Sequence, residues 1–376
     1  MNISVILHAY YLDDTRVIRH CEWLSKNGKT VTVFCLNKGG ESKEDVVNGV
    51  VIKRAPVSRS KSKTKLSYIV EYFLFFFFSF YQATKALIVD KPDLYIINNM
   101  PNALVFTALI PRIFGVPVLL DVHDLMPELC EIVFSGKESF LKKVLLLEER
   151  LSFNFATHLM TVSKPVVRLL STRSKKKFHI THNSPSNFSE NNNELEGAPK
   201  IVFHGNIHER YGIQRILEPL NNLAANGCSF VFHIHGKGPY VNELNHLIKG
   251  HNYINFHGEF VPHEVPNILQ GAALGVIMNY PNRSNDFALP VKMLEYIANN
   301  VAVICPKLPV IQEYFTEDSV FYFNDDSDLQ GVIELALSNE QLRKQKTQVA
   351  FQKYTEIAWE NEKHDYLTFI EACNEN

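Results

Sequence analysis

Short apolar runs alternate with helical patterns along most of the chain. The first run, ISVILH, precedes a segment in which Val17, Cys21 and Leu24 recur at helical spacing and which stops at Gly28. Comparable pairs of an apolar run and a helical pattern continue as far as the run VAVIC. This alternation is typical of a parallel sheet covered by helices on both faces.

A polar segment divides the pattern into two parts. The stretch SPSNFSENNNELEGA has almost no apolar periodicity and is typical of a linker. We therefore predict an α/β protein with two doubly wound, Rossmann-like domains, which suits a length of 376 residues. The predicted parts are a first domain over 1–185, a linker over 186–198, a second domain over 199–340 and further helices over 341–376.

Composition and charge narrow the classes of function. The formal net charge of -2 gives no global field that would recruit nucleic acid, so no nucleic-acid partner is predicted. The six cysteines lie far apart without a C-x-x-C pair, which favours neither a zinc site nor a redox dithiol. The N-terminus has no basic region before its apolar run and is interpreted as a first strand, so we expect a cytoplasmic protein.

The segment NDFALPVKMLEYIANNVAVIC, residues 285–305, carries candidate chemistry. Pro290 suits the first turn of a helix, whose free amides, including that of Val291, form an anion site. Lys292 adds a charge for phosphate, and Glu295, one turn further on the same face, is placed to accept hydrogen bonds from sugar hydroxyls. A nucleoside diphosphate sugar offers both groups. The alternative is an exposed Lys–Glu pair, which stabilises a helix by about 0.2–0.5 kcal/mol.

This segment resembles the donor-site helix of retaining glycosyltransferases of the family 4 type, which have the GT-B fold. One branch of that family has Asn, a few residues, then Leu-Pro-x-Lys-x-x-Glu-Tyr, and this chain has Asn285, Leu289, Pro290, Lys292, Glu295 and Tyr296. Many members carry two glutamates eight residues apart. Glu295 matches the second, which contacts the donor ribose, whereas Phe287 stands in place of the first. Asn285 and Asp286 are candidate substitutes.

Other segments extend the resemblance over nearly the whole chain. FHGNIHERYGIQRIL resembles the phosphate loop that opens the second domain, which implies donor contacts at Gly205 and Arg210. Asn206 stands where the family usually has an Arg. Gly236, after the next predicted strand, is a further donor-site candidate. LLDVHDLMPEL resembles the acceptor-side segment, which implies that His123 lies near the reacting sugar.

Either Asp121 or Asp124 is a candidate to orient the imidazole of His123. The alternative interpretation of Asp124 is a helix N-cap in a turn after a strand. The family's transfer is generally argued to proceed by front-face attack with help from the leaving phosphate, so no general base is assigned.

The resemblance implies transfer of a sugar, with retention, from a nucleotide-diphosphate sugar to a saccharide acceptor, expected to be lipid-linked, in surface polysaccharide synthesis. It also implies that the helices after residue 340 cross back toward the first domain. No cofactor is expected. The alternatives are a non-catalytic scaffold of the same fold and a nucleotide-sugar epimerase, which needs additional carboxylates. A dinucleotide-dependent oxidoreductase is disfavoured because no G-x-G-x-x-G follows the first strand.

Two further groups are candidate metal ligands. The acidic stretch FNDDSDLQ lies late in the chain, and Ser327 or Asp328 suits the N-cap of a helix. His233 and His235 share one face of a predicted strand and could bind a metal, although packing on the strand is the favoured interpretation. No metal is therefore predicted.

A basic segment precedes a strongly aromatic one in the first domain. Residues 53–65 contain six Lys or Arg and no acid, and residues 66–84 are nearly uncharged except for Glu71. A membrane span is not predicted, because it would bury Glu71 and interrupt a Rossmann-like domain. We instead expect peripheral attachment to the anionic inner face of the cell membrane. The candidate contact residues are Lys61, Lys63, Lys65, Phe75 and Phe76.

Overall fold

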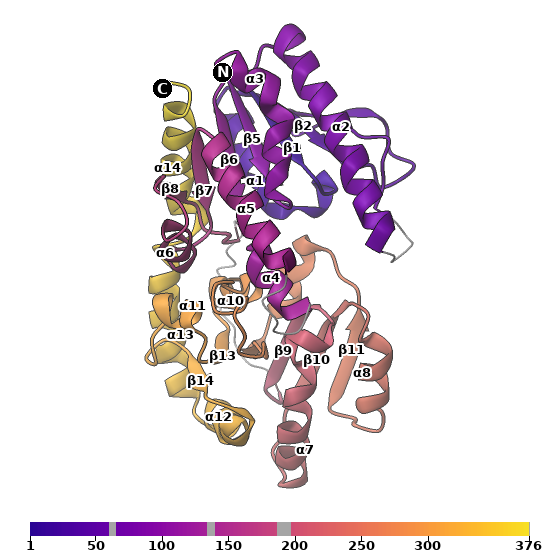
Figure 1. Cartoon of the computed structure of the whole chain (residues 1–376). Coiled ribbons are helices and arrows are strands. Elements are labelled where there is room, and N and C mark those ends of the chain that lie inside the picture. The colour runs from indigo at the N-terminus through magenta and orange to yellow at the C-terminus, as the bar shows by residue number, and fades with distance from the viewer. Residues whose placement is uncertain (60–64, 134–139, 186–196, 376) are drawn as a thin grey trace. The chain divides into compact units, whose positions relative to one another are not determined.

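The computed structural model describes residues 1–59, 65–133, 140–185 and 197–375, which form two compact units (Figure 1). Unit 1 comprises Met1–His182 together with Glu362–Asn376, and unit 2 comprises Asn183–Asn361. Each unit is built on one sheet with helices packed against it. Of the predicted linker, all but the last two residues lie outside the described part of the chain.

Unit 1 contains an eight-stranded sheet in the order β3-β4-β2-β1-β5-β6-β7-β8. All neighbouring strands are parallel except β3 and β4, which pair antiparallel at one edge. The strands are β1 (Asn2–Leu7), β2 (Thr30–Cys35), β3 (Glu44–Val47), β4 (Val50–Arg54), β5 (Leu94–Asn98), β6 (Val118–Val122), β7 (His158–Thr161) and β8 (Phe178–Ile180). Strands β5 and β6 are buried along their whole length, as parallel strands covered on both faces are.

The helices of unit 1 connect these strands and include the end of the chain. They are η1 (Tyr11–Asp13), α1 (Thr15–Lys26), α2 (Lys65–Val89), η2 (Asn102–Ala108), α3 (Leu109–Ile113), α4 (Met126–Val133), α5 (Phe140–Phe155), α6 (Lys164–Ser171) and α14 (Trp359–Ala372). Helix α14 packs on α1, where His20 stacks on Tyr366 with ring centroids 4.5 Å apart. The Trp23 indole N–H also donates to the carbonyl of Lys363 at 2.8 Å.

Unit 2 contains a six-stranded, fully parallel sheet in the order β11-β10-β9-β12-β13-β14. The strands are β9 (Lys200–Asn206), β10 (Val231–Lys237), β11 (Ile254–Gly258), β12 (Ala272–Val276), β13 (Ala302–Pro306) and β14 (Phe321–Phe323). Successive strands are added on one side of β9 as far as β11, and from β12 onward they are added on its other side. The carboxyl ends of β9 and β12 therefore form the topological switch point at which such sheets bind ligands.

Helices cover both faces of the unit 2 sheet. They are η3 (Glu209–Tyr211), η4 (Ile213–Ile216), α7 (Leu217–Ala225), α8 (Val241–Leu247), η5 (Pro262–Glu264), α9 (Val265–Leu269), α10 (Val291–Ala298), α11 (Pro309–Tyr314), α12 (Asp326–Ser338) and α13 (Glu340–Thr355). Helices α7, α8 and α12 share one apolar cluster with the sheet. Helices α9, α10, α11 and α13 share the other, on what we call the α10 face.

These sheets confirm the predicted fold class of two Rossmann-like α/β domains. The chain passes from unit 1 to unit 2 between His182 and Asn183 and returns to unit 1 at Glu362. Helix α13, within the predicted C-terminal helices, packs on unit 2 through Ala350 and Tyr354. Only the part of the chain from Glu362 onward belongs to unit 1.

Helix α2 is the aromatic helix that connects β4 to β5. By length and composition it is long and apolar enough to cross a membrane over Ser67–Val89, with 22% of that window buried. Its two ends, however, join strands of the same sheet, and Glu71 is buried with a carboxylate oxygen 3.3 Å from the imidazole of His8, the residue after β1. The helix therefore lies on the sheet.

One predicted membrane contact is wrong, because Phe75 is fully buried against the sheet side of α2. Its neighbours Phe73 and Phe77 are 60% and 64% exposed, since successive helical residues point about 100° apart. Phe76 is half-buried. Lys61 and Lys63 lie outside the described residues, as does the side chain of Lys65.

Candidate active site

The candidate donor site lies where β9 ends and α10 begins in unit 2. Pro290, with φ of -68°, is the N-cap of α10, and Val291 is its first residue. The amide of Val291 is thus among the N-terminal groups that have no acceptor within the helix. Met293, Leu294 and Ile297 are buried on the α10 face, which leaves Lys292 and Glu295 on the side of the helix away from that apolar cluster.

The position of α10 is fixed by close contact with β12. A Cβ atom on Gly275 would lie 2.3 Å from Cγ of Tyr296, so only glycine allows this ring to rest on the strand. The Tyr296 hydroxyl also accepts a hydrogen bond from the amide of His204 on β9 at 3.3 Å. Helix α10 is therefore tied to both strands of the switch point.

Lys292 lies beside the carboxyl end of β9. Its ammonium is 4.0 Å from the ring centroid of Phe203, and a Cβ on Gly205 would lie 3.9 Å from Nζ. Burial lowers the pKa of Lys292 to about 7, although the neighbouring carboxylate of Glu295 acts in the opposite direction. Burial likewise raises the pKa of Glu295 to about 7. Both groups are thus poised to change charge near neutral pH.

Arg210 and Tyr211, in η3, approach the same place. The Arg210 guanidinium donates to the Tyr211 hydroxyl at 2.8 Å and lies 4.8 Å from the centroid of its ring. The Lys292 ammonium is 5.6 Å from the centroid of that ring. Two cations therefore lie around one aromatic side chain next to Gly205, and this arrangement favours an anion such as a diphosphate.

The other predicted donor residues have mainly structural contacts. A Cβ on Gly236 would lie 1.9 Å from the carbonyl oxygen of Gly205, so the ends of β9 and β10 approach closely only because residue 236 is glycine. The side-chain amide of Asn285 donates to the carbonyl of Tyr280 at 2.7 Å, and its backbone amide donates to Asn282 at 3.0 Å. Asn285 thus holds the loop before α10 in place.

The predicted catalytic residues His123 and Asp124 follow β6 in unit 1. The side-chain amide oxygen of Asn99 accepts from both of their backbone amides, at 3.1 and 3.3 Å. Arg16, on α1, donates to Nδ1 of His123 at 2.8 Å and forms a buried ion pair with Asp121. The carboxylate of Asp121 therefore acts on His123 through Arg16, whereas the backbone of Asp121 is itself a hydrogen-bond partner of the ring.

These contacts define the hydrogen-bonding state of His123. A guanidinium only donates, so Nδ1 of His123 accepts and the proton of the neutral ring is on Nε2. Burial, reinforced by the charge of Arg16, holds the pKa of His123 well below its usual range, so the ring is neutral at neutral pH. Nε2 is 3.7 Å from a carboxylate oxygen of Asp124, too far for a hydrogen bond. The Nε2–H is therefore a donor suited to a ligand oxygen.

The late acidic stretch is a helix cap. Asp325 is the N-cap of α12 and accepts from the amide of Ser327 at 2.8 Å, and Asp328 completes a capping box. The prediction of a cap is confirmed, although the N-cap residue is Asp325 rather than Ser327 or Asp328. Asp326 pairs with Arg215 at 2.6 Å.

Two family models match this chain. The family described as "Glycosyl transferases group 1" matches residues 186–353, and the "Glycosyl transferase 4-like domain" matches residues 14–181. Together they cover every strand of the two sheets except β1. The chain is a glycosyltransferase with the GT-B fold. A search of curated proteins finds no match.

Solved structures share the fold at low identity. Sucrose-phosphate synthase from Thermosynechococcus elongatus has a TM-score of 0.77 at 12% identity, over 99% of this chain and 98% of that one. WaaG, a glycosyltransferase involved in lipopolysaccharide biosynthesis, has a TM-score of 0.68 at 15% identity, over 96% of this chain and 98% of that one. A trehalose-6-phosphate protein from E. coli bound with UDP-2-fluoro glucose has a TM-score of 0.70 at 11% identity, over 100% of this chain and 99% of that one.

Proposed function

We propose that this glycosyltransferase moves a sugar, with retention, from a nucleotide-diphosphate sugar to a lipid-linked saccharide in surface polysaccharide synthesis. The observation that carries the donor assignment is the grouping of Lys292, Arg210 and Gly205 beside the carboxylate of Glu295. The bound UDP-2-fluoro glucose of one structural relative and the lipopolysaccharide role of WaaG support the proposal.

The basic and acidic residues of the donor site contact different parts of the donor. Lys292 and Arg210 stabilise the negative charge that grows on the leaving diphosphate, so the reaction uses no metal or other cofactor. Glu295 accepts hydrogen bonds from the ribose hydroxyls. The bond from the sugar C1 to the phosphate oxygen breaks while a bond from C1 to the acceptor oxygen forms. The acceptor proton passes to the leaving phosphate, because Nδ1 of His123 is already occupied by Arg16.

A thermal-shift screen with UDP, GDP, dTDP and CDP tests the donor site. A nucleotide present at about 100 times its dissociation constant adds about 2.7 kcal/mol to the free energy of unfolding. We expect one nucleotide to stabilise the wild type and Lys292→Ala and Glu295→Ala to lose that effect. If no nucleotide stabilises the wild type with detergent and lipid present, the scaffold interpretation replaces this one.

Nucleotide binding is expected to take up a proton above pH 7. In the protein without nucleotide, the pKa of Lys292 is lowered to about 7, so this side chain is mostly neutral at pH 8. A bound diphosphate favours the ammonium form and therefore raises this pKa. Affinity therefore falls by up to about tenfold per pH unit above 7 until the pKa of the complex is reached. Calorimetry at pH 8 in buffers of different ionisation enthalpy measures the uptake. Lys292→Met abolishes it, and an uptake unchanged in that variant contradicts the assignment.

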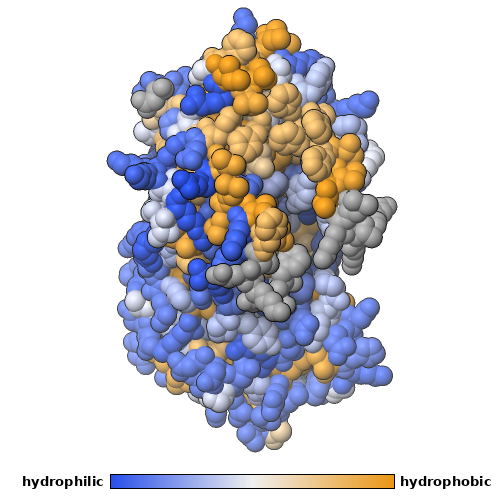
Figure 2. Space-filling view, in the orientation of Figure 1, coloured by the Kyte–Doolittle hydropathy of each residue, from blue (hydrophilic) through white to orange (hydrophobic). Residues whose placement is uncertain are grey.

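The lipid-linked acceptor is supported by an exposed apolar face on unit 1. Figure 2 shows hydrophobic residues gathered over α2, α3 and α5. Both α2 and α5 pack on η2, and α2 also packs on α3, so the three helices lie on one side of the sheet. The exposed apolar residues of this face are Tyr68, Ile69, Val70, Phe73, Leu74, Phe77 and Tyr81 of α2, Leu109, Ile113 and Phe114 at α3, and Phe140, Leu141, Val144, Leu147 and Leu151 of α5.

Exposed basic side chains accompany this apolar face, namely Lys85, Arg112, Lys143 and Arg150. Each Lys or Arg near an anionic leaflet contributes about 1 kcal/mol to binding. We therefore propose that unit 1 attaches peripherally, through α2, α3 and α5, to the inner face of the cell membrane.

Replacing both Phe73 and Phe77 with Asp is expected to weaken binding to anionic vesicles by at least about tenfold, since each removes a large apolar side chain from the lipid contact. Co-sedimentation with phosphatidylglycerol vesicles at low salt measures the affinity. Leu335→Asp, at a residue of α12 that is 47% exposed, is the control and binds as the wild type does. A wild type that ignores these vesicles contradicts the membrane proposal.

A further inference from the structure

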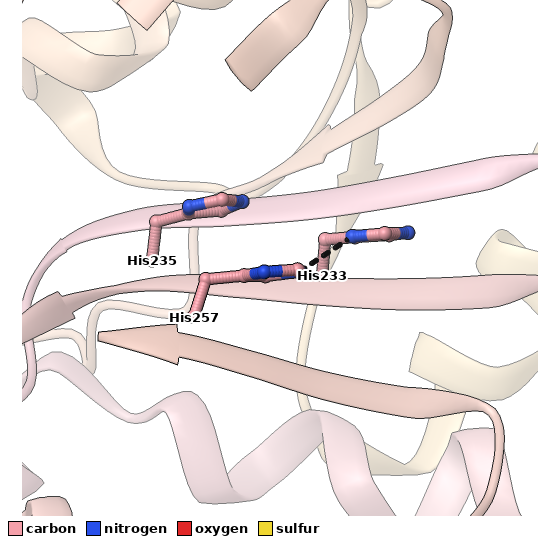
Figure 3. Close-up of side chains that lie close together, drawn as sticks. All are labelled: His233, His235 and His257. Atoms are coloured by element: carbon pink, nitrogen blue, oxygen red, sulfur yellow. Dashed lines mark hydrogen bonds between the residues drawn. The ribbon is translucent and has the colours of Figure 1, made fainter. Parts of the chain in front are cut away.

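Three histidines meet on the α10 face of the unit 2 sheet. On β10, Phe232 and Ile234 enter the apolar cluster of α7 and α8, so the alternating side chains of His233 and His235 lie on the opposite face. His257 joins them from β11 (Figure 3). All three imidazoles thus stand on the same surface of two neighbouring strands.

An irregular register brings His257 between the other two. Ile234 pairs with Phe256, but the next residue, His235, pairs with Gly258, so His257 is the extra residue of a bulge. Its ring is parallel to both neighbours within 8°, with centroids 5.0 Å from His233 and 4.3 Å from His235. Nδ1 of His233 and Nε2 of His257 share a hydrogen bond of 2.8 Å.

Among the residues that the structure describes, little covers this side of the sheet at the three histidines. Between β11 and β12 the chain forms only η5 and the five-residue α9, which packs through Val265, Ile268 and Leu269. His257 is exposed, and His233 and His235 are half-buried. Of the charged groups near the cluster, Lys200 acts on both His233 and His235, and Glu264 acts on His235 with the opposite sign.

We propose that His233, His235 and His257 bind one zinc ion, with water as the fourth ligand. One ligand nitrogen from each ring already lies within 4.8 Å of the others. A tetrahedral zinc with bonds of about 2.0–2.1 Å needs nitrogens about 3.4 Å apart, so the stacked rings must turn about their side-chain bonds until the three nitrogens converge on the ion. Three imidazoles without thiolates suit Zn²⁺, Cu²⁺ and Ni²⁺ rather than Mg²⁺ or Ca²⁺.

The zinc clamps the edge of the sheet and takes no part in sugar transfer. It joins β11, the edge strand, to β10 one residue before Gly236, whose backbone contacts the carbonyl of Gly205. Metal binding therefore stabilises the folded state of unit 2, because the unfolded chain lacks this arrangement of ligands.

Zinc titration of the tag-free, chelator-treated full chain, in competition with a chromogenic chelator, tests the site. We expect one Zn²⁺ per chain, a rise in melting temperature that saturates at one equivalent, and Co²⁺ absorption bands typical of tetrahedral coordination. His257→Ala, at an exposed position, folds normally and binds zinc at least 100-fold more weakly. His246→Ala, at an exposed residue of α8, is the matched control and binds as the wild type does.

Equal zinc affinity in the wild type and in His257→Ala overturns the proposal. So does a number of bound zinc ions per chain that stays the same when His257 is replaced. The outcome is independent of the proposed transfer reaction. Chelator-treated protein is expected to keep its nucleotide-induced thermal shift, and Lys292→Ala is expected to keep its zinc.

Discussion

Replacing Lys292 with Met lowers kcat/KM for donor turnover by at least about 100-fold. The ammonium lies in a poorly solvated position beside Gly205 and within 6 Å of the Tyr211 ring, where Arg210 also lies. A preorganised charge in such a site stabilises the transition state by about 2.7–4 kcal/mol, which corresponds to a factor of about 10²–10³. Methionine keeps the length of the side chain and its packing on Phe203 while it removes the charge.

The melting temperature separates this loss from misfolding. Removing a buried ammonium also removes its desolvation cost, so the free Lys292→Met protein is expected to melt at the wild-type temperature or above it. Steady-state hydrolysis of the nucleotide sugar chosen by the thermal-shift screen measures turnover. Lys307→Met is the control, since Lys307 is paired with Glu317 at 2.9 Å on the surface of unit 2. A kcat/KM for Lys292→Met within threefold of the wild-type value would contradict the donor-site assignment.

The donor site could be predicted largely because its signals are local. Pro290, Lys292 and Glu295 lie within six residues, and helical geometry alone places the two charges together. Arg210 was assigned through the resemblance of FHGNIHERYGIQRIL to the family's phosphate loop. Tyr211, which brings Arg210 and Lys292 to one place, was missed, because an aromatic residue next to a helix start has no distinctive pattern.

Arg16 was missed because its partners are distant in sequence. It contacts His123, 107 residues away, and pairs with Asp121, 105 residues away. Only the tertiary fold, which brings Arg16 at the start of α1 to the carboxyl end of β6, creates this cluster. No local spacing in the sequence marked Arg16 as a partner of the histidine.

The buried face of α2 and the third histidine of the cluster were likewise not predicted from the sequence. The small buried residues Ser79, Ala83 and Ala86 mark the face toward the sheet, and a helical projection from them would have placed Phe75 inward. For His233 and His235, the sequence showed a shared strand face. The third ring depends on a bulge in β11, which strand periodicity does not reveal.

Removing the carboxylate of Asp121 destabilises unit 1 by about 3–5 kcal/mol. Arg16 is 4% exposed and Asp121 is 1% exposed, so Asp121→Ala leaves a buried guanidinium without its counter-charge. Unfolding in urea, followed by the fluorescence of Trp23 in a Trp359→Phe background, reports on α1 in unit 1. The midpoint of this transition is expected to fall with little change in slope.

The double variant Arg16→Met, Asp121→Leu distinguishes an unpaired charge from a simple cavity. Replacing both members of a buried ion pair with apolar side chains is often neutral or stabilising, so it is expected to recover at least half of the loss. His123 then loses the donor at Nδ1, and the double variant remains impaired in turnover although it is folded. A loss below about 1 kcal/mol in Asp121→Ala, or a double variant as unstable as the single one, contradicts the view that Asp121 positions His123 through a charged Arg16.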